Sequence, residues 1–241
     1  MTTTDPQPPD RTFAVLASTM RSGSTLLKAL LAGAPDVSHL PEVNFQSVLP
    51  SPAKRRKLEE SAAEPILLLK RPAWFHETGR YPRIPDGLPV RRILLLRDAY
   101  ETVRSVGRML GGKRFDRFPG FPGQRFLARR YWAPVTRRLL AVAREHPGES
   151  ILVRYETLLE APEEETLRVF RFLGSVRTSG TRSYANPDGF RWKWGSDDGS
   201  ERIRTKEVQP PRPLGAQETR RRERLLALPQ IHRVREEAGY A

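Results

Sequence analysis

Residues 12–34 read TFAVLA (12–17), STMRSGST (18–25) and LLKALLAGA (26–34). The first part is a short apolar run of β-compatible residues, and the last part is apolar with helix-compatible residues. Together they predict a strand, a tight loop and a helix. In such a loop the backbone N–H groups and the helix N-terminus can hold one anion together. Residues 18–25 are therefore a candidate phosphate-binding loop, although a polar turn without a ligand also fits the loop taken alone.

The candidate loop differs at two positions from the GxxxxGK[ST] motif of nucleotide-binding proteins. Ser18 stands in place of the first glycine and Ser24 in place of the lysine, while the basic residue, Arg21, lies inside the loop. A kinase uses the lysine on the terminal phosphates and a hydroxyl to hold its metal ion. The sequence thus disfavours a standard nucleoside-triphosphate enzyme.

Three more apolar runs follow, at residues 66–70, 93–96 and 151–153. Apolar runs without alternation are typical of strands covered on both faces, as in parallel sheets. Helical patterns separate them, at residues 99–110 and 126–145 and from Pro162 onward. We therefore expect an α/β fold, a three-layer P-loop-like domain whose mostly parallel central sheet is flanked by helices.

The expected domain organisation is simple. Residues 1–10 are polar and proline-rich and are expected to be a disordered lead, and residues 11–241 are expected to form one domain. Residues 111–125 and 176–215 are rich in glycine, proline and charge, and are expected to be long loops. Loops of that length in a folded domain are usually functional or mobile.

The composition limits the kind of protein. With 42 Lys+Arg against 28 Asp+Glu, the net charge is +14, and 35 of the 42 cations are arginine. This excess favours an anionic partner, either nucleic acid, a membrane surface or a phosphorylated ligand, although codon usage in a GC-rich genome also explains many arginines. No apolar run approaches the ~20 residues of a membrane span. The opening MTTTDPQPPDR does not resemble a secretory signal and there is no cysteine, so we expect a cytoplasmic protein without disulfides.

A second candidate anion site follows the third predicted strand. Arg97 ends the run RRILLLR (91–97), at the carboxyl end of a strand, where ligands of open α/β sheets bind. Ser105 lies eight residues later, about two turns along the next helix. A guanidinium can fork onto a phosphate while a serine hydroxyl adds a neutral donor.

With these motifs the chain resembles the sulfotransferases that use 3′-phosphoadenosine-5′-phosphosulfate (PAPS). Residues 21–27, RSGSTLL, are similar to the 5′-phosphosulfate loop of the glycan, tyrosyl-protein and many bacterial members, and differ more from the KSGTT form of the cytosolic enzymes. Residues 96–105 resemble the 3′-phosphate motif, with the same spacing from arginine to serine. Residues 154–174 contain RYETLL, PEE and FLG in the family's order, and residues 228–240 resemble a common family ending.

The resemblance implies transfer of a sulfuryl group from PAPS to a hydroxyl or amine by in-line displacement, without a metal. It places the 3′-phosphate on Arg97 and Ser105 and the adenine near Tyr155, which also fits the pattern of an ordinary core tyrosine. The 5′-phosphosulfate is assigned to Arg21 and to the loop amides of Ser22, Gly23, Ser24 and Thr25. Positioning and charge stabilisation supply most of the catalysis in such a transfer.

The catalytic groups expected from the resemblance are Lys70, Arg21 and a base. Lys70 stands where cytosolic members carry a lysine that assists the leaving group, but their histidine two residues later is Pro72 here. Glu42 resembles the base of the glycan and tyrosyl-protein branches, and a glutamate is ionised at neutral pH and can accept a hydroxyl proton. His39 and His76 remain alternative bases.

Other positions leave the partners open. The aromatic that stacks on adenine in cytosolic members is Leu26 here. Arg204 and Lys206 are candidate donors to the 3′-phosphate, although a solvated loop fits this segment equally well. The acceptor is expected to be a small molecule, glycan or natural product held by loops 44–64, 73–90, 111–125 and 176–200. The aromatic side chains of these loops are Trp74, Phe75, Phe115, Phe118, Phe121, Phe190, Trp192 and Trp194. Nothing in the sequence predicts the oligomeric state.

Two other functions compete with this interpretation. A nucleotide or small-molecule kinase would require a lysine at the end of the loop, which is absent. A non-catalytic basic module for RNA or DNA would leave the ordered motifs unexplained, and the aromatic residues do not form a stacking pattern. We therefore expect no nucleic-acid partner.

Overall fold

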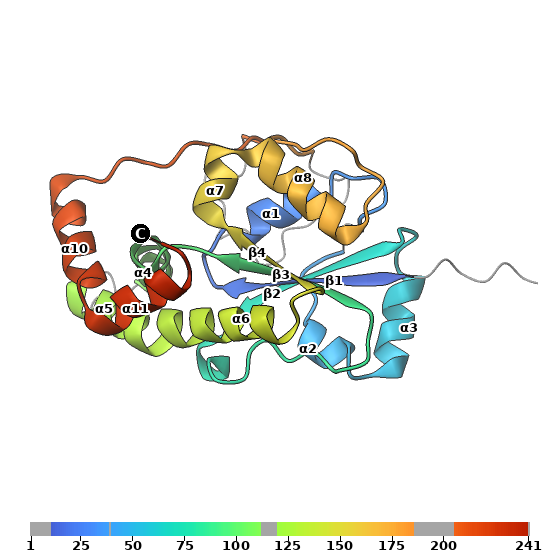
Figure 1. Cartoon of the computed structure of the whole chain (residues 1–241), viewed down its shortest axis with the longest axis horizontal. Helices are drawn as coiled ribbons and strands as arrows, with labels where there is room; N and C mark the ends of the chain where they lie inside the picture. Colours follow the sequence, from blue (N-terminus) through green and yellow to red (C-terminus); the bar gives the residue numbers. More distant parts are fainter. Residues whose placement is uncertain (1–10, 39, 112–119, 186–204, 241) are drawn as a thin grey trace, which may run out of the picture.

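A four-stranded parallel sheet forms the centre of the structure, a computed structural model that describes residues 11–38, 40–111, 120–185 and 205–240 (Figure 1). The strands are β1 (Thr12–Thr19), β2 (Ile66–Ala73), β3 (Val90–Leu96) and β4 (Ser150–Arg154), in the order β2-β1-β3-β4. All three pairings are parallel. The strands extend beyond the apolar runs because polar end residues also pair, as Ser18 does with Pro72 and Thr19 with Ala73.

Helices connect and cover the strands. Between β1 and β3 lie α1 (Ser24–Leu31), α2 (Phe45–Val48), α3 (Pro52–Glu60) and the short 3-10 helix η1 (Phe75–Glu77). Between β3 and β4 lie α4 (Ala99–Leu110), α5 (Phe121–Leu127), the π-helix η2 (Ala128–Trp132) and α6 (Ala133–Glu145). After β4 come α7 (Tyr155–Glu160), α8 (Pro162–Leu173), α10 (Ala216–Leu226) and α11 (Pro229–Glu237).

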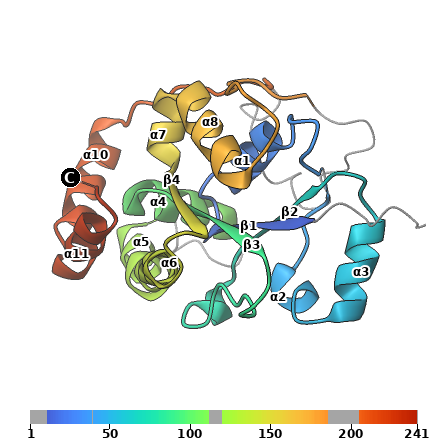
Figure 2. The ribbon, with the colours of Figure 1, turned by 45° about the vertical axis from the view of Figure 1, so that its right-hand side comes forward.

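The sheet separates two apolar cores, so the fold has three layers. Along β1, Phe13, Val15 and Ala17 belong to one core, while Ala14 and Leu16 belong to the other. The first core includes side chains of α4, α5, α6 and α11, and the second includes those of α1, α7 and α8. Figures 1 and 2 show α1, α7 and α8 on one side of the sheet and α6 on the other. The expected three-layer α/β fold is confirmed.

Some helices begin where loops were expected. The segment 44–64 contains α2 and α3, and α3 begins at Pro52 after Ser51, whose side chain accepts a hydrogen bond from the Lys54 amide. A serine N-cap followed by proline is a favoured helix start. The expected loop 111–125 ends earlier, because α5 begins at Phe121, and the expected helix 126–145 is divided into α5, η2 and α6.

Other expectations are met only in part. The pattern from Pro162 onward predicts that Leu167, Phe170 and Phe172 pack inward; Phe170 is buried, whereas Leu167 and Phe172 are only half-buried. In the described parts of 176–215 the regular pairing is an isolated antiparallel bridge between Ser183 and Glu207. The expected disordered lead at 1–10 lies outside the described residues. No helix in the described ranges is long and apolar enough to cross a membrane.

The strand order places a switch point between β1 and β3. After β1 the chain moves to β2 on one side, and it then crosses β1 to form β3 on the other side. The helix after β1, α1, contributes to one core, and the helix after β3, α4, contributes to the other. The segments that leave β1 and β3 therefore diverge at the carboxyl edge of the sheet. Ligands of open α/β sheets bind at such a point.

Candidate active site

The loop between β1 and α1 is shaped by two left-handed residues. Arg21 has φ 61° and Gly23, the N-cap of α1, has φ 89°. A Cβ on Gly23 would lie 2.2 Å from Cε2 of Tyr155, so no side chain fits there. Ser24 and Thr25 follow, buried in the first turn of α1. The first N–H groups of a helix have no partner within the helix, and they are the donors that such a loop offers to an anion.

Ser22 closes the loop with its own side chain. Its hydroxyl donates to the carbonyl of Thr19 at 2.8 Å, and the residue is fully buried. The Ser22 hydroxyl is therefore committed to the loop, and its backbone N–H is the group that could face a ligand.

Two buried tyrosines hold the loop against the end of β2. The Tyr81 hydroxyl accepts from the Ser18 amide at 2.8 Å and donates to the Arg71 carbonyl at 2.6 Å. The Tyr131 hydroxyl accepts from the Met20 amide at 2.6 Å and donates to the Ala73 carbonyl at 2.7 Å. Burial raises the pKa of both hydroxyls, so both stay protonated as donors. The sequence carries no local signal for either residue.

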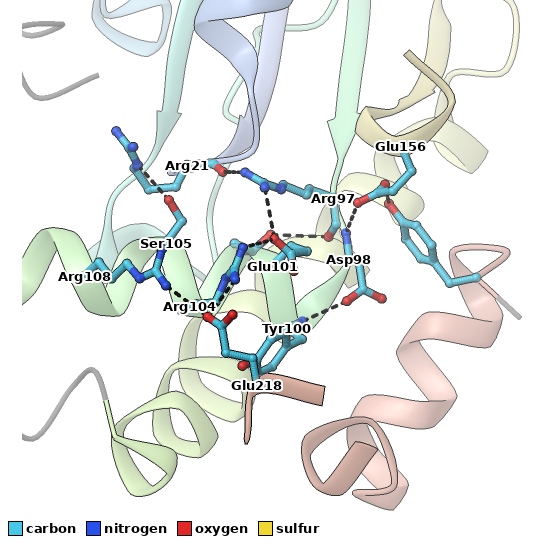
Figure 3. A network of polar contacts seen from close by, with 12 residues as sticks. Arg21, Arg97, Asp98, Tyr100, Glu101, Arg104, Ser105, Arg108, Glu156 and Glu218 are labelled. Atoms are coloured by element: carbon cyan, nitrogen blue, oxygen red, sulfur yellow. Dashed lines mark hydrogen bonds and ion pairs between the residues drawn. The ribbon is translucent and has the colours of Figure 1, made fainter. Parts of the chain in front are cut away.

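The structure brings Arg21, Arg97 and Ser105 together at the switch point (Figure 3). Nε of Arg21 donates to Oγ of Ser105 at 3.1 Å, and Nη1 of Arg97 donates to the Arg21 carbonyl at 2.7 Å. The loop after β1 and the segment after β3 are thus joined by two hydrogen bonds. Three residues predicted to bind two ends of one ligand are neighbours.

Arg97 is a cation with spare donor capacity. Its guanidinium lies over the ring of Tyr155, 4.3 Å from the centroid, and Nη2 lies 3.4 Å from Oε2 of Glu101. Glu101 is shared, because its Oε2 also accepts from Arg104 at 2.8 Å. Nε of Arg97 is buried without a hydrogen-bond partner. A buried donor without an acceptor beside a second arginine and a serine hydroxyl is a set of groups that fits a phosphate.

Two of the three predicted catalytic residues, Lys70 and Glu42, form an ion pair. Nζ of Lys70 lies 2.8 Å from Oε2 of Glu42 and donates to Oγ1 of Thr25 at 3.0 Å. Lys70 is buried, while about a third of the Glu42 side chain is exposed. Because Thr25 belongs to the loop and Lys70 ends the apolar part of β2, this contact places both charged groups beside the first turn of α1.

A second lysine, which sequence reasoning missed, lies beside this pair. Lys28 is buried in α1, and its Nζ donates to the Leu40 carbonyl, two residues before Glu42. The pKa of Lys28 is lowered from its ordinary 10.5 to about 8. Burial is the largest cause, the charge of Lys70 acts in the same direction, and the charge of Glu42 opposes both. α1 therefore holds the segment that carries Glu42.

The remaining predicted residues are less central or not described. His76 lies on η1 and is exposed. Lys206 is exposed, with φ 59°, and its carbonyl accepts from the Tyr184 amide at 3.0 Å. Outside the described residues lie His39, Arg204, Phe115, Phe118, Phe190, Trp192 and Trp194. Within the described ranges, no group of three or more His, Asp and Glu residues could hold a metal ion.

Of the expected acceptor aromatics, Trp74, Phe75 and Phe121 are described. Trp74 and Phe75 follow β2 directly and are 44% and 38% exposed, and the Phe75 ring packs 4.7 Å from the Tyr131 ring. Phe121 instead packs on the core at the start of α5, with Arg224 above its ring at 4.5 Å. The exposed apolar surface nearest to Lys70 along the chain is thus that of Trp74 and Phe75.

Comparisons with known proteins identify the fold. The structure matches the sulfotransferase domain of the Synechococcus PCC 7002 olefin synthase with a TM-score of 0.58 and 19% identity over 98% of both chains. It matches the sulfotransferase domain of the curacin biosynthetic pathway with a TM-score of 0.53 and 16% identity over 96% of this chain and 98% of that one. A mouse sulfotransferase complexed with PAP gives a TM-score of 0.51 and 13% identity over 96% of this chain and 89% of that one.

The comparisons by sequence found no match, in contrast to the comparison by structure. No protein-family model matches the chain, and no curated protein matches it. At these identities the structural matches show that the chain has the sulfotransferase fold along nearly its whole length.

Gly23→Ala is expected to destabilise the protein for two separable reasons. The new Cβ meets the Tyr155 ring at 2.2 Å, and a left-handed backbone is strained for alanine by about 1 kcal/mol. In denaturant unfolding we expect a loss above that figure, partly recovered when Tyr155→Ala is added. Gly148→Ala is the control, because no atom lies within 4 Å of its Cβ position. Equal stability of Gly23→Ala and Gly148→Ala would contradict the close contact.

Lys28→Met tests the buried charge. A lysine whose pKa falls on folding binds its proton less tightly in the folded state than in the unfolded state. The free energy of unfolding therefore increases as the pH rises from about 8 towards 10.5. We expect Lys28 to contribute roughly 2 kcal/mol of extra stability to the wild type at pH 10 relative to pH 7. Lys28→Met should lose this gain in urea unfolding, while the exposed Lys57→Met should keep it. If both variants gain the same stability between pH 7 and pH 10, the pKa of Lys28 is not lowered by folding.

Proposed function

We propose that the protein transfers a sulfuryl group from PAPS to a hydroxyl or amine of an acceptor. The observation that carries this proposal is the cluster of Arg21, Arg97 and Ser105 at the switch point, beside a loop turned by Gly23. Two neighbouring groups of anion-binding residues suit a donor that carries phosphates at both its 3′ and 5′ positions. The sulfotransferase fold supports the same conclusion.

The donor would lie across the carboxyl edge of the sheet. The loop amides of Ser22, Gly23, Ser24 and Thr25 would bind the 5′-phosphosulfate, and Arg97 with Ser105 would bind the 3′-phosphate. Arg21 belongs to the loop through its backbone and contacts Ser105 through its side chain, so it would link the two sites. Tyr155, packed between Gly23 and Arg97, is proposed to contact the adenine.

The transfer itself would use the Lys70–Glu42 pair. The acceptor oxygen or nitrogen forms a bond to sulfur as the bond from sulfur to the bridging phosphate oxygen breaks, which releases adenosine 3′,5′-bisphosphate (PAP). Lys70 and Arg21 would offset the charge that develops on the departing oxygen, and Glu42 would accept the acceptor's proton. Lys70 and Glu42 bind each other in the structure, so the two groups would act side by side.

The acceptor is proposed to be a small molecule, a glycan or a natural product. Trp74 and Phe75, exposed after β2, offer an apolar surface for its non-reacting part. Such a surface can stack on a sugar or pack on a hydrocarbon. Radiolabelled PAPS offered with a panel of acceptors would identify the class.

Ligand-induced stabilisation tests the donor site. At 100 times its Kd, PAP should add ~2.7 kcal/mol of stability and raise the melting temperature by several degrees. Arg97→Ala should lose this response, whereas Arg144→Ala, which removes an equal charge from an exposed position on α6, should keep it. A response to ATP with Mg²⁺ or to short RNA, without one to PAP, would overturn the proposal.

Glu42→Gln tests the base. The amide can still accept a hydrogen bond from Lys70 but cannot take a proton, so we expect sulfuryl transfer to fall at least ~10²-fold with the Kd for PAP unchanged. The measurement is transfer of label from PAPS to an acceptor found in the panel. The exposed Glu160→Gln serves as control and should be fully active. Wild-type activity in Glu42→Gln would assign the base elsewhere.

A further inference from the structure

The turn that carries Arg97 is held by the C-terminal helix and the residues after it. We infer that Glu156, Arg235 and Tyr240 are positioning residues for Arg97, and that they set how strongly the protein prefers a ligand with a 3′-phosphate. This inference rests on the proposed role of Arg97 in binding that phosphate.

Asp98, the residue after Arg97, is bound on both carboxylate oxygens. Oδ1 caps α4 by accepting from the Tyr100 amide at 3.0 Å, and Oδ2 accepts from Nε of Arg235 at 3.0 Å. The side chains of Asp98 and Arg235 are 8% and 9% exposed. Removal of one partner of a buried ion pair leaves the other charge uncompensated. Arg235 in α11 therefore fixes Asp98 at the start of α4.

Glu156 makes the second connection (Figure 3). Its Oε1 accepts from the Asp98 amide at 3.0 Å, and its Oε2 accepts from the Tyr240 hydroxyl at 3.0 Å. Burial, which outweighs these hydrogen bonds, raises the pKa of Glu156. The carboxylate links the turn after β3 to the end of the chain, and both of its oxygens are used.

The peptide between Arg97 and Asp98 is thereby held at both polar atoms. Its carbonyl accepts from Nε1 of Trp132 at 2.9 Å, and its N–H donates to Glu156. The Arg97 side chain lies on the ring of Tyr155, the residue before Glu156. A rotation of this peptide would swing the guanidinium away from the Arg21 carbonyl. An error of about 1 Å in such a group can cost about 10²-fold in function.

The chain end is itself fixed in place. Nε of Arg154 donates to the Ala238 carbonyl at 3.1 Å, and its guanidinium lies 5.6 Å from the Tyr240 ring centroid. Gly239 has φ 72°, and a Cβ there would lie 2.0 Å from Nη2 of Arg154. The arginine occupies the space where a side chain at 239 would lie. Tyr240 is therefore held so that its hydroxyl reaches Glu156.

The charges of these residues also affect phosphate binding directly, in addition to positioning Arg97. Asp98 and Glu156 place two carboxylates next to the backbone of Arg97, and like charges there would oppose an incoming phosphate. Arg235 compensates Asp98. Without that cation, the site should lose affinity for the 3′-phosphate in particular, and affinity for the remainder of the nucleotide should change little.

The test compares two nucleotides that differ in one group. PAP carries the 3′-phosphate, and adenosine 5′-monophosphate (AMP) lacks it, so the ratio of their Kd values from calorimetric titration isolates the contribution of that phosphate. We expect Arg235→Met, which leaves Asp98 uncompensated, and Glu156→Ala, which removes both acceptor oxygens, to weaken PAP binding about tenfold and AMP binding less than about twofold. Arg235→Lys, which keeps the charge, should recover part of the ratio. Arg233→Met, exposed on the same helix with the same charge change, should retain it fully.

The outcomes separate this inference from the proposed function. If the wild type binds PAP no better than AMP, the 3′-phosphate role of Arg97 itself fails. If the wild type prefers PAP and the folded Arg235→Met and Glu156→Ala variants keep the same ratio of Kd values, the positioning role is overturned. Should these variants not fold, Tyr240→Phe removes one hydroxyl and keeps the ring. Tyr240→Phe should lower the preference for PAP over AMP about threefold. An unchanged preference in this variant would also overturn the inference.

Discussion

The arrangement of residues at the switch point depends on the missing side chain of Gly23. The ring of Tyr155 fills the space in which a Cβ at position 23 would lie, so the loop after β1 and the segment after β4 can approach closely. The Arg97 guanidinium packs on the same Tyr155 ring. Three segments that leave β1, β3 and β4 are joined through one glycine and one aromatic ring, and the polar contacts of the site are arranged around them.

The site has two halves with different electrostatic character. Around Arg97 the charges form a network of arginines and carboxylates that continues through Glu101 and Arg104 to Glu218 of α10. Around Lys70 there are two lysines and one glutamate, and burial of Lys28 makes its charge costly. In the proposed function the first half binds a fixed charge and the second handles a proton and a leaving group. The second half is accordingly the one that contains the Lys70–Glu42 ion pair.

The sequence predicted the parts of the site that follow a strand directly. The strand, loop and helix around Arg21, the strand end at Arg97 and the position of Lys70 all come from short apolar runs, because a buried parallel strand has a local signature. Helix α2 was missed because four residues are too few to show a helical period. Of α3, only residues 54–57 were interpreted as a solvated helix face, because the helix lacks a long apolar face that would mark its bounds. Tyr81, Tyr131 and Arg235 were missed for another reason. Their partners lie 63, 111 and 137 residues away, and no local pattern encodes such contacts.

Two consecutive residues of the π-helix η2 bind the loop after β1 and the turn after β3. Tyr131 binds the loop after β1 through the Met20 amide, and Trp132 binds the turn after β3 through the Arg97 carbonyl. A π turn holds one more residue than an α turn, and such turns recur at functional sites. Here it allows two successive side chains to reach the same edge of the sheet, where both are buried. Two adjacent residues therefore set the distance between the loop after β1 and the turn after β3. Deletion of one residue from η2 would change that distance.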